Sequence, residues 1–270
     1  TEIPDDPRAG EKLTALYEKS GKWHALIEFL NGQIRRLDDD ATEEKTALLF
    51  QIIEIYQDPS RLPVEEMVIQ TYNRIVQESP TNVRALDNLA ERYEDAHRWS
   101  ELVQVLRKKI ATCVDEDELL DLYLQVADLY VSKMSNESQA IPFLELILEL
   151  DPQNLQVVRT LRQIYKGKHN LERLCATYEA ELQLLGGADR EPLLNELATL
   201  TAEKLYRYDD AIEHLRELIS LNPRNERAHK MLERLFTQTE RWFDYVELLE
   251  DRLANSRTKR KKVEILQRLG

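Results

Sequence analysis

The chain has 270 residues, of which 42% are apolar and 32% charged, and its formal net charge at pH 7 is −13. The apolar share is enough for a buried core and excludes wholesale disorder, while the acidic balance argues against a nucleic-acid ligand, which needs a basic surface. Only seven glycines are present, so phosphate-binding loops and tight hairpins are disfavoured.

Amphipathic α-helices are expected along the whole chain, because apolar residues recur at spacings of three and four with charged residues between them. No stretch alternates with a period of two, so no strand is expected. The pattern predicts helix pairs and one last single helix at residues 8–37, 42–78, 82–113, 116–149, 154–184, 189–220, 225–254 and 259–269.

The breaks between helices recur at nearly equal intervals. Ser79–Asn82, Asp151–Asn154 and Asn222–Asn225 share the order polar residue, proline, any residue, asparagine. The proline ends one helix and the asparagine can cap the next. The same rhythm is kept by Trp23, Trp99, Leu171 and Trp242. A period near 72 corresponds to two helix pairs of about 36 residues each.

The residues between the breaks follow a shared pattern. Three second helices match one another at Val68, Tyr72 and Pro80, at Ala140, Leu144 and Pro152, and at Ala211, Leu215 and Pro223. The first helices carry Leu-x3-Tyr or a variant at Leu13/Tyr17, Ile52/Tyr56, Leu89/Tyr93, Val126/Tyr130, Leu161/Tyr165 and Leu232/Phe236, whereas Leu197/Thr201 departs. On these residues the chain resembles the tetratricopeptide repeat (TPR) family over nearly its full length.

The resemblance implies an all-α fold, a right-handed superhelical solenoid of about seven antiparallel helix pairs and a final single helix. We expect one repeat array over residues 1–270, taken from a longer chain. Small residues of the family pattern are replaced by Leu102, Leu174 and Tyr245 in alternate repeats, so alternate pairs should pack with altered crossing. Trp99 and Trp242 are expected to be largely buried between successive pairs.

A search for catalytic chemistry finds no candidate. Phosphate-loop, nucleophile-elbow and zinc-protease motifs are absent from the sequence. The five histidines lack metal-ligand spacing, and the acidic runs at 38–40 and 115–118 are explained by solvated surface and by the helix dipole. We therefore expect no enzyme, no metal and no cofactor.

The compartment is only weakly indicated. Cys113 and Cys175 lie in different predicted helices and read as small buried apolar residues, which suits a reducing compartment and favours the cytoplasm. No apolar run approaches the length of a membrane span, so no membrane insertion is expected.

The resemblance places a binding face on the first helices, which line the concave side of such arrays and bind a peptide or a helix of a partner protein. Basic residues occupy the expected inward positions in the C-terminal half, and we predict that they contact an acidic segment of a partner protein: Arg159, Lys166, Arg227, Lys230 and Arg234. A solvated face of ordinary charge remains the alternative interpretation.

One ligand known for the family can be tested directly on the sequence. Co-chaperone members hold a C-terminal carboxylate with basic and amide side chains at set positions, which correspond here to Arg159, Gln163, Glu196, Arg227 and Met231. Glu196 would repel a carboxylate and Met231 cannot donate a hydrogen bond, so this clamp is not expected.

Two function classes stay open from the sequence. The first is a protein-interaction scaffold with a partner in the groove. The second is an architectural spacer in a large repeat protein, with no groove ligand. A helical RNA reader would need a basic groove, which the net charge of −13 opposes.

Overall fold

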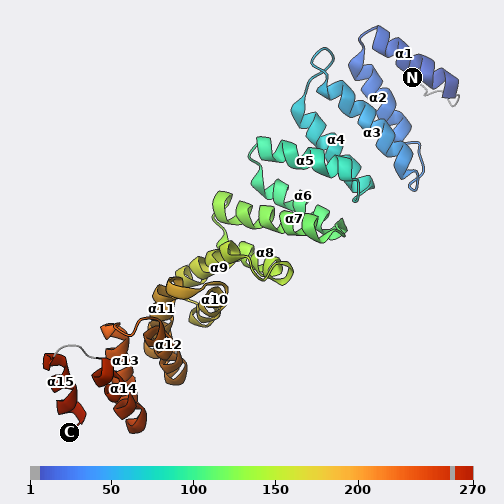
Figure 1. Cartoon of the computed structure of the whole chain (residues 1–270). Coiled ribbons are helices and arrows are strands. Elements are labelled where there is room, and N and C mark those ends of the chain that lie inside the picture. Colours follow the sequence, from blue (N-terminus) through green and yellow to red (C-terminus); the bar gives the residue numbers. More distant parts are fainter. Residues whose placement is uncertain (1–6, 256–258, 270) are drawn as a thin grey trace. The chain divides into compact units, whose positions relative to one another are not determined.

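The computed structural model describes residues 7–255 and 259–269, and in this part of the chain it contains fifteen α-helices and no strand (Figure 1). Helices account for about 80% of the chain. The predicted all-α class is therefore confirmed. The chain divides into two compact units, Thr1–Phe143 (unit 1) and Leu144–Gly270 (unit 2). The prediction of one continuous array from a longer protein stays a prediction.

Consecutive helices pack against each other from α1 to α7 in unit 1 and from α9 to α15 in unit 2 (Figure 1). The helices of unit 1 are α1 (Pro7–Lys19), α2 (Trp23–Ile34), α3 (Thr42–Gln57), α4 (Glu65–Glu78), α5 (Val83–Asp95), α6 (Trp99–Thr112), α7 (Glu116–Asp128), the π-helical turn η1 (Leu129–Lys133) and the start of α8 (Glu137–Leu150). The helices of unit 2 are the end of α8, α9 (Leu155–Gly167), α10 (Leu171–Leu184), the short 3-10 helix η2 (Gly187–Asp189), α11 (Arg190–Glu203), α12 (Tyr208–Leu221), α13 (Glu226–Gln238), α14 (Trp242–Asn255) and α15 (Lys259–Leu269).

The asparagines of the three proline breaks cap helices as predicted. Asn82, Asn154 and Asn225 each accept a hydrogen bond from the backbone amide three residues later, at 3.0, 3.2 and 3.1 Å. Such a side chain satisfies one of the free amides of the first helical turn. The repeated breaks therefore fix where α5, α9 and α13 begin.

The expected burial of the tryptophans is wrong for one of them. Trp242 is 56% exposed. Trp99 is half-buried, stacks on His97 with ring centroids 5.1 Å apart, and has the Lys133 ammonium 5.7 Å from its ring centre. An equal position in the repeat does not give equal burial, because burial also depends on what the next helices bring.

The turn before the second helix has the same backbone conformation in six pairs. The residue two positions before the helix has a positive φ of 50–65° in each, and only the first of the six is a glycine: Gly21, His97, Ser135, His169, Tyr206 and Glu240. This left-handed conformation is strained for residues with a Cβ. It explains how a chain with few glycines still makes tight turns.

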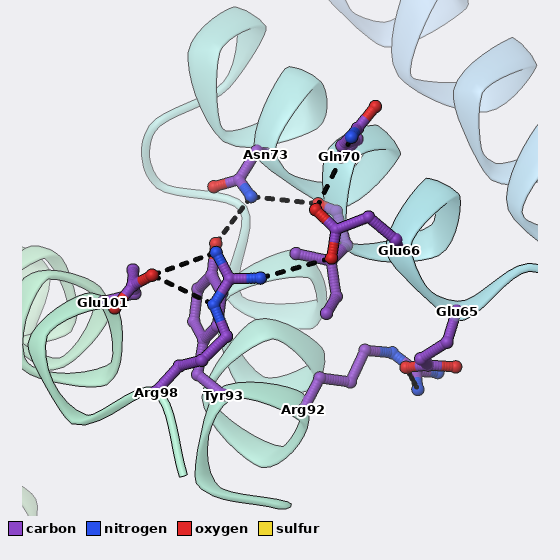
Figure 2. A network of polar contacts seen from close by, with 9 residues as sticks. Glu65, Glu66, Gln70, Asn73, Arg92, Tyr93, Arg98 and Glu101 are labelled. Atoms are coloured by element: carbon purple, nitrogen blue, oxygen red, sulfur yellow. Dashed lines mark hydrogen bonds and ion pairs between the residues drawn. The ribbon is translucent and has the colours of Figure 1, made fainter. Parts of the chain in front are cut away.

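An arginine directly before a second helix fastens that helix to the preceding second helix. Arg98, the residue before α6, donates to Glu101 at 2.9 Å and to Glu66 of α4 at 3.3 Å. Its guanidinium group lies 4.9 Å from the ring centre of Tyr93. Figure 2 shows this group between Glu101 and Glu66, and also Asn73 Nδ2, which donates to the Tyr93 hydroxyl at 2.7 Å. We call this arrangement the arginine strap.

The strap recurs in unit 2. Arg241 donates to Asp244 at 2.7 Å and to Asp209 of α12 at 2.9 Å, and lies 5.8 Å from the Phe236 ring centre. Each of these four residues follows its counterpart in unit 1 by the same separation along the chain. Arg207, directly before α12, pairs in the same way with Glu172 of α10 at 2.6 Å. The same kind of contact therefore recurs at three junctions between successive second helices, at Arg98, Arg207 and Arg241.

Candidate functional site

The five predicted basic residues lie on two first helices of unit 2, and all five are exposed. Arg159 and Lys166 lie on α9, and Arg227, Lys230 and Arg234 lie on α13. The first helix between them in the chain, α11, carries Glu196 and Glu203. The helix between the two basic helices in the chain therefore carries acidic side chains.

Arg159 is held by a buried carboxylate. Its Nε donates to Glu181 Oε1 of α10 at 2.9 Å, and Arg162 Nη1 lies 3.0 Å from the other oxygen. Glu181 is only 1% exposed. A buried carboxylate needs paired charge, so Arg159 and Arg162 have a structural task in joining α9 to α10.

Lys166 takes part in a small network with α11. Its ammonium lies 3.4 Å from Glu196 Oε2, and the Tyr178 hydroxyl donates to the same oxygen. The hydrogen bond from Tyr178, with the positive charge of Lys166 acting in the same direction, holds the pKa of Glu196 below its usual value. Burial, together with the neighbouring carboxylate, raises the pKa of Tyr178. Glu196 is therefore ionised and Tyr178 protonated at neutral pH.

The remaining three basic residues differ in their pairing. Arg234 Nη2 lies 2.9 Å from Glu203 of α11. Within the described residues, Arg227 and Lys230 have no ion-pair partner. Glu181, Glu196 and Glu203 thus pair with three of the five cations and reduce their mutual repulsion. Arg227 and Lys230 are the two cations left unpaired.

A surface pocket of about 370 Å³ brings two of the predicted residues together. Lys166 and Arg227 both line it, although they lie on different helices, α9 and α13. The lining also contains Lys204, Glu196 and apolar or neutral side chains, among them Leu174, Tyr178, Asn195, Thr199 and Leu200. Sequence reasoning missed Lys204 and Tyr178. The first-helix pattern gives no signal for them, because Lys204 follows α11 and Tyr178 belongs to the second helix α10.

The acidic charge of the chain is concentrated in unit 1. Residues 1–143 hold 16 lysines and arginines against 28 aspartates and glutamates, a net charge of −12, whereas residues 144–270 hold 21 against 22, a net charge of −1. The overall value of −13 therefore says little about unit 2. A local excess of positive charge around the pocket is compatible with it.

The groups that could carry metal or nucleophilic chemistry are unsuited to it. In the described parts of the chain, no group of three His, Cys, Asp or Glu side chains is arranged to hold a metal ion. Burial, with Glu179 nearby, raises the pKa of the Cys175 thiol to about 12, so the reactive thiolate is scarce at neutral pH. None of the described helices combines the length and apolar character needed to span a membrane.

A comparison with protein families matches residues 120–154 to the family described as tetratricopeptide repeat. The match covers most of α7, η1 and α8. Residues 120–154 therefore resemble a tetratricopeptide repeat in sequence. Leu-x3-Tyr or a variant of it also occurs in the first helices of the other pairs, except at Leu197/Thr201. No curated protein sequence matches the chain.

Several solved structures are similar to the chain at low sequence identity. The chain is 17% identical to YrrB, described as a TPR protein with an unusual peptide-binding site, with a TM-score of 0.36 over 75% of this chain and 96% of YrrB. It is 18% identical to MamA, with a TM-score of 0.34 over 67% of this chain and 96% of MamA. For yeast Tom70 the identity is 15% and the TM-score 0.32, over 94% of this chain and 59% of Tom70.

Proposed function

We propose that the chain is a protein-interaction scaffold and that the first-helix face of unit 2 binds an acidic segment of a partner protein. The observation that carries the proposal is the pocket lined by Lys166, Lys204 and Arg227 and by one carboxylate, Glu196. Three positive charges against one negative charge leave an excess that favours an anion. The tetratricopeptide repeat match supports the scaffold class.

The lining of the pocket also suggests the kind of acidic segment. Leu174 and Leu200 form an apolar part of the wall, where a ligand gains about 25 cal/mol for each Å² of apolar surface removed from water. A carboxylate next to an aliphatic or aromatic side chain fits this mixture. Lys230 lies three positions after Arg227 on α13, which puts both on one side of the helix and extends the positive charge beyond the pocket.

The five predicted residues then have different roles in the proposal. Arg227 and Lys230 are free to meet the ligand directly. Lys166 meets it while keeping its contact with Glu196. Arg159 and Arg234 act mainly through Glu181 and Glu203, and so position the face.

A direct test uses a labelled peptide of alternating glutamate and leucine, with a lysine–leucine peptide of equal length as the control ligand. We expect the acidic peptide alone to bind, and its affinity to fall as salt rises, because screening weakens attraction between exposed charges. Replacing Arg227 and Lys230 with glutamate should weaken binding at least about tenfold.

The matched control replaces Lys12 and Lys108, two exposed lysines of unit 1, with glutamate. It changes the net charge equally and should leave the affinity within about twofold, while circular dichroism verifies that both variants remain helical. Equal weakening by both variants would show only a general charge effect. Equal binding of both peptides would leave the architectural spacer as the better interpretation.

A further inference from the structure

A second surface pocket of unit 2, of about 380 Å³, is lined by residues of α12, α13 and α14. Its apolar lining consists of Ile219, Leu232, Phe236 and Leu248. Leu232 and Phe236 of α13 are each only 1% exposed, so they form the floor. The pocket shares no lining residue with the pocket of the proposed function. It is therefore a separate place in which a ligand can bury apolar surface.

Phe236 stands where equivalent first helices carry a tyrosine with a bound hydroxyl group. The Tyr93 hydroxyl accepts a hydrogen bond from Asn73 of α4 at 2.7 Å (Figure 2), and the Tyr165 hydroxyl donates to Glu145 of α8 at 3.0 Å. Phe236 has no hydroxyl group to make such a bond. The space beside its ring is therefore not used for a contact of this kind and belongs to the pocket.

Carboxylates of α14 form the charged wall of the pocket. Asp244, Glu247 and Asp251 all line it, and their spacings of three and four place them along one face of the helix. Arg216 of α12 supplies the positive charge of the lining. With three carboxylates and one guanidinium group, the lining favours a cation.

The pocket already holds one arginine, and its contacts show which kind of cation fits. Arg216 Nη2 lies 2.6 Å from Asp244 Oδ1, and the Arg216 guanidinium group lies 5.7 Å from the ring centre of Phe236. Asp244 also accepts a hydrogen bond from Arg241 at 2.7 Å, so its charge is compensated. Glu247, one turn further along α14, has no ion-pair partner among the described residues. A second arginine can therefore bind there as Arg216 binds to Asp244.

The acidic wall differs from that of the equivalent helix α6. The separation that relates the two arginine straps pairs Glu247 with Gln104 and Asp251 with Lys108. Gln104 and Lys108 are both exposed although α7 packs on α6. This side of a second helix therefore faces solvent within a run of helices as well, and the negative charge is what distinguishes the pocket at α14.

We propose that this pocket binds an arginine side chain of a partner protein, together with an apolar residue next to it in the partner's sequence. The guanidinium group donates to Glu247, with the carboxylate of Asp251 one turn further along the helix. Its planar set of donors suits carboxylates, and it is more weakly hydrated than the ammonium group of a lysine. The apolar neighbour packs against Leu248, where it is removed from water.

The test measures the binding of a labelled peptide of alternating arginine and leucine to the whole 270-residue chain by fluorescence anisotropy. We expect saturable binding. Replacing the arginines with citrulline, which is uncharged, or the leucines with serine should weaken it at least about tenfold. A lysine–leucine peptide should also bind at least about tenfold more weakly, because an ammonium group lacks the planar set of donors.

Variants of the protein locate the binding site. Glu247→Lys should weaken binding of the arginine–leucine peptide at least about tenfold. Glu250→Lys makes the same change of charge at an exposed position of α14 outside the pocket, and should leave the affinity within about twofold. The Arg227→Glu, Lys230→Glu double variant should bind the peptide normally, which separates this pocket from that of the proposed function. Absence of binding, equal affinity for the arginine and lysine peptides, or equal weakening by the two α14 variants would overturn the proposal.

Discussion

The guanidinium group of Arg98 lies 3.3 Å from the carboxylate of Glu66 and joins the start of α6 to the start of α4. The contact crosses from one helix pair to the next, and its counterpart in unit 2 joins Arg241 to Asp209 at 2.9 Å. The hydrophobic spacing within each helix does not by itself determine how one helix pair is placed on the next. The straps supply a repeated contact that does so at defined junctions.

Replacing Arg98 with alanine should lower the free energy of unfolding by about 1–2 kcal/mol. The partly exposed ion pairs contribute up to about 1 kcal/mol, and the contact with the Tyr93 ring contributes about 0.5–1 kcal/mol. Urea denaturation measures the change. Glu66→Gln should cost less than half as much, because Arg98 keeps its contacts with Glu101 and Tyr93. Equal losses in the two variants would contradict this division.

Replacing Glu240 with glycine should stabilise the protein by up to about 1 kcal/mol. Glu240 has a φ of +56°, which costs about 1–2 kcal/mol for a residue with a Cβ, and the greater freedom of glycine in the unfolded chain offsets about 0.4–1 kcal/mol of the gain. Thermal denaturation measures the effect. The reverse change Gly21→Ala, at a φ of +65° with open space around the Cα atom, should destabilise by about 1 kcal/mol. The prediction requires the two changes in stability to have opposite signs, and two changes of the same sign would contradict it.

Replacing both arginine partners of Glu181 should lower the free energy of unfolding more than replacing Glu181 with a neutral residue. Replacing Arg159 and Arg162 with alanine leaves a buried carboxylate without compensation, which typically costs about 3–5 kcal/mol. Glu181→Gln leaves two partly exposed arginines that water can reach, and should cost about 1–2 kcal/mol. Chemical denaturation of the two variants gives the order. The reverse order would show that water already reaches Glu181.

The change Tyr178→Phe should raise the pKa of Glu196 and make the protein less stable at neutral pH by about 1 kcal/mol, the usual net value of such a hydrogen bond. The folded pKa of Glu196 lies below its unfolded value, which is about 4.3 for a free glutamate. Its contribution to stability is therefore fully present above that pH and is lost as the pH falls through the folded pKa. NMR titration of the Glu196 carboxyl measures the shift, and an unchanged pKa would remove Tyr178 as its cause.

Much of the local structure could be predicted from residue patterns. The three asparagines after the prolines cap α5, α9 and α13, and both residues of the pair Leu89 and Tyr93 are buried. These features depend on neighbours three or four positions apart along one helix, and such neighbours are fixed by helix geometry. The sequence predicted only part of the candidate site. The prediction considered positively charged residues on the first helices alone, and so it could not include Lys204, which follows α11, or Tyr178 of the second helix α10.

The sequence by itself determined the helices, their pairing and the period of two helix pairs, since each depends on local hydrophobic spacing and helix-ending residues. Only the tertiary structure decided which charges are satisfied. It placed Arg159 on the buried Glu181 and left Arg227 and Lys230 without a partner among the described residues. It also left Trp242 exposed where Trp99 is half-buried. The physical reason is that burial and ion pairing depend on which side chains neighbouring helices bring within a few ångströms, and residues far apart in the chain meet only when those helices pack.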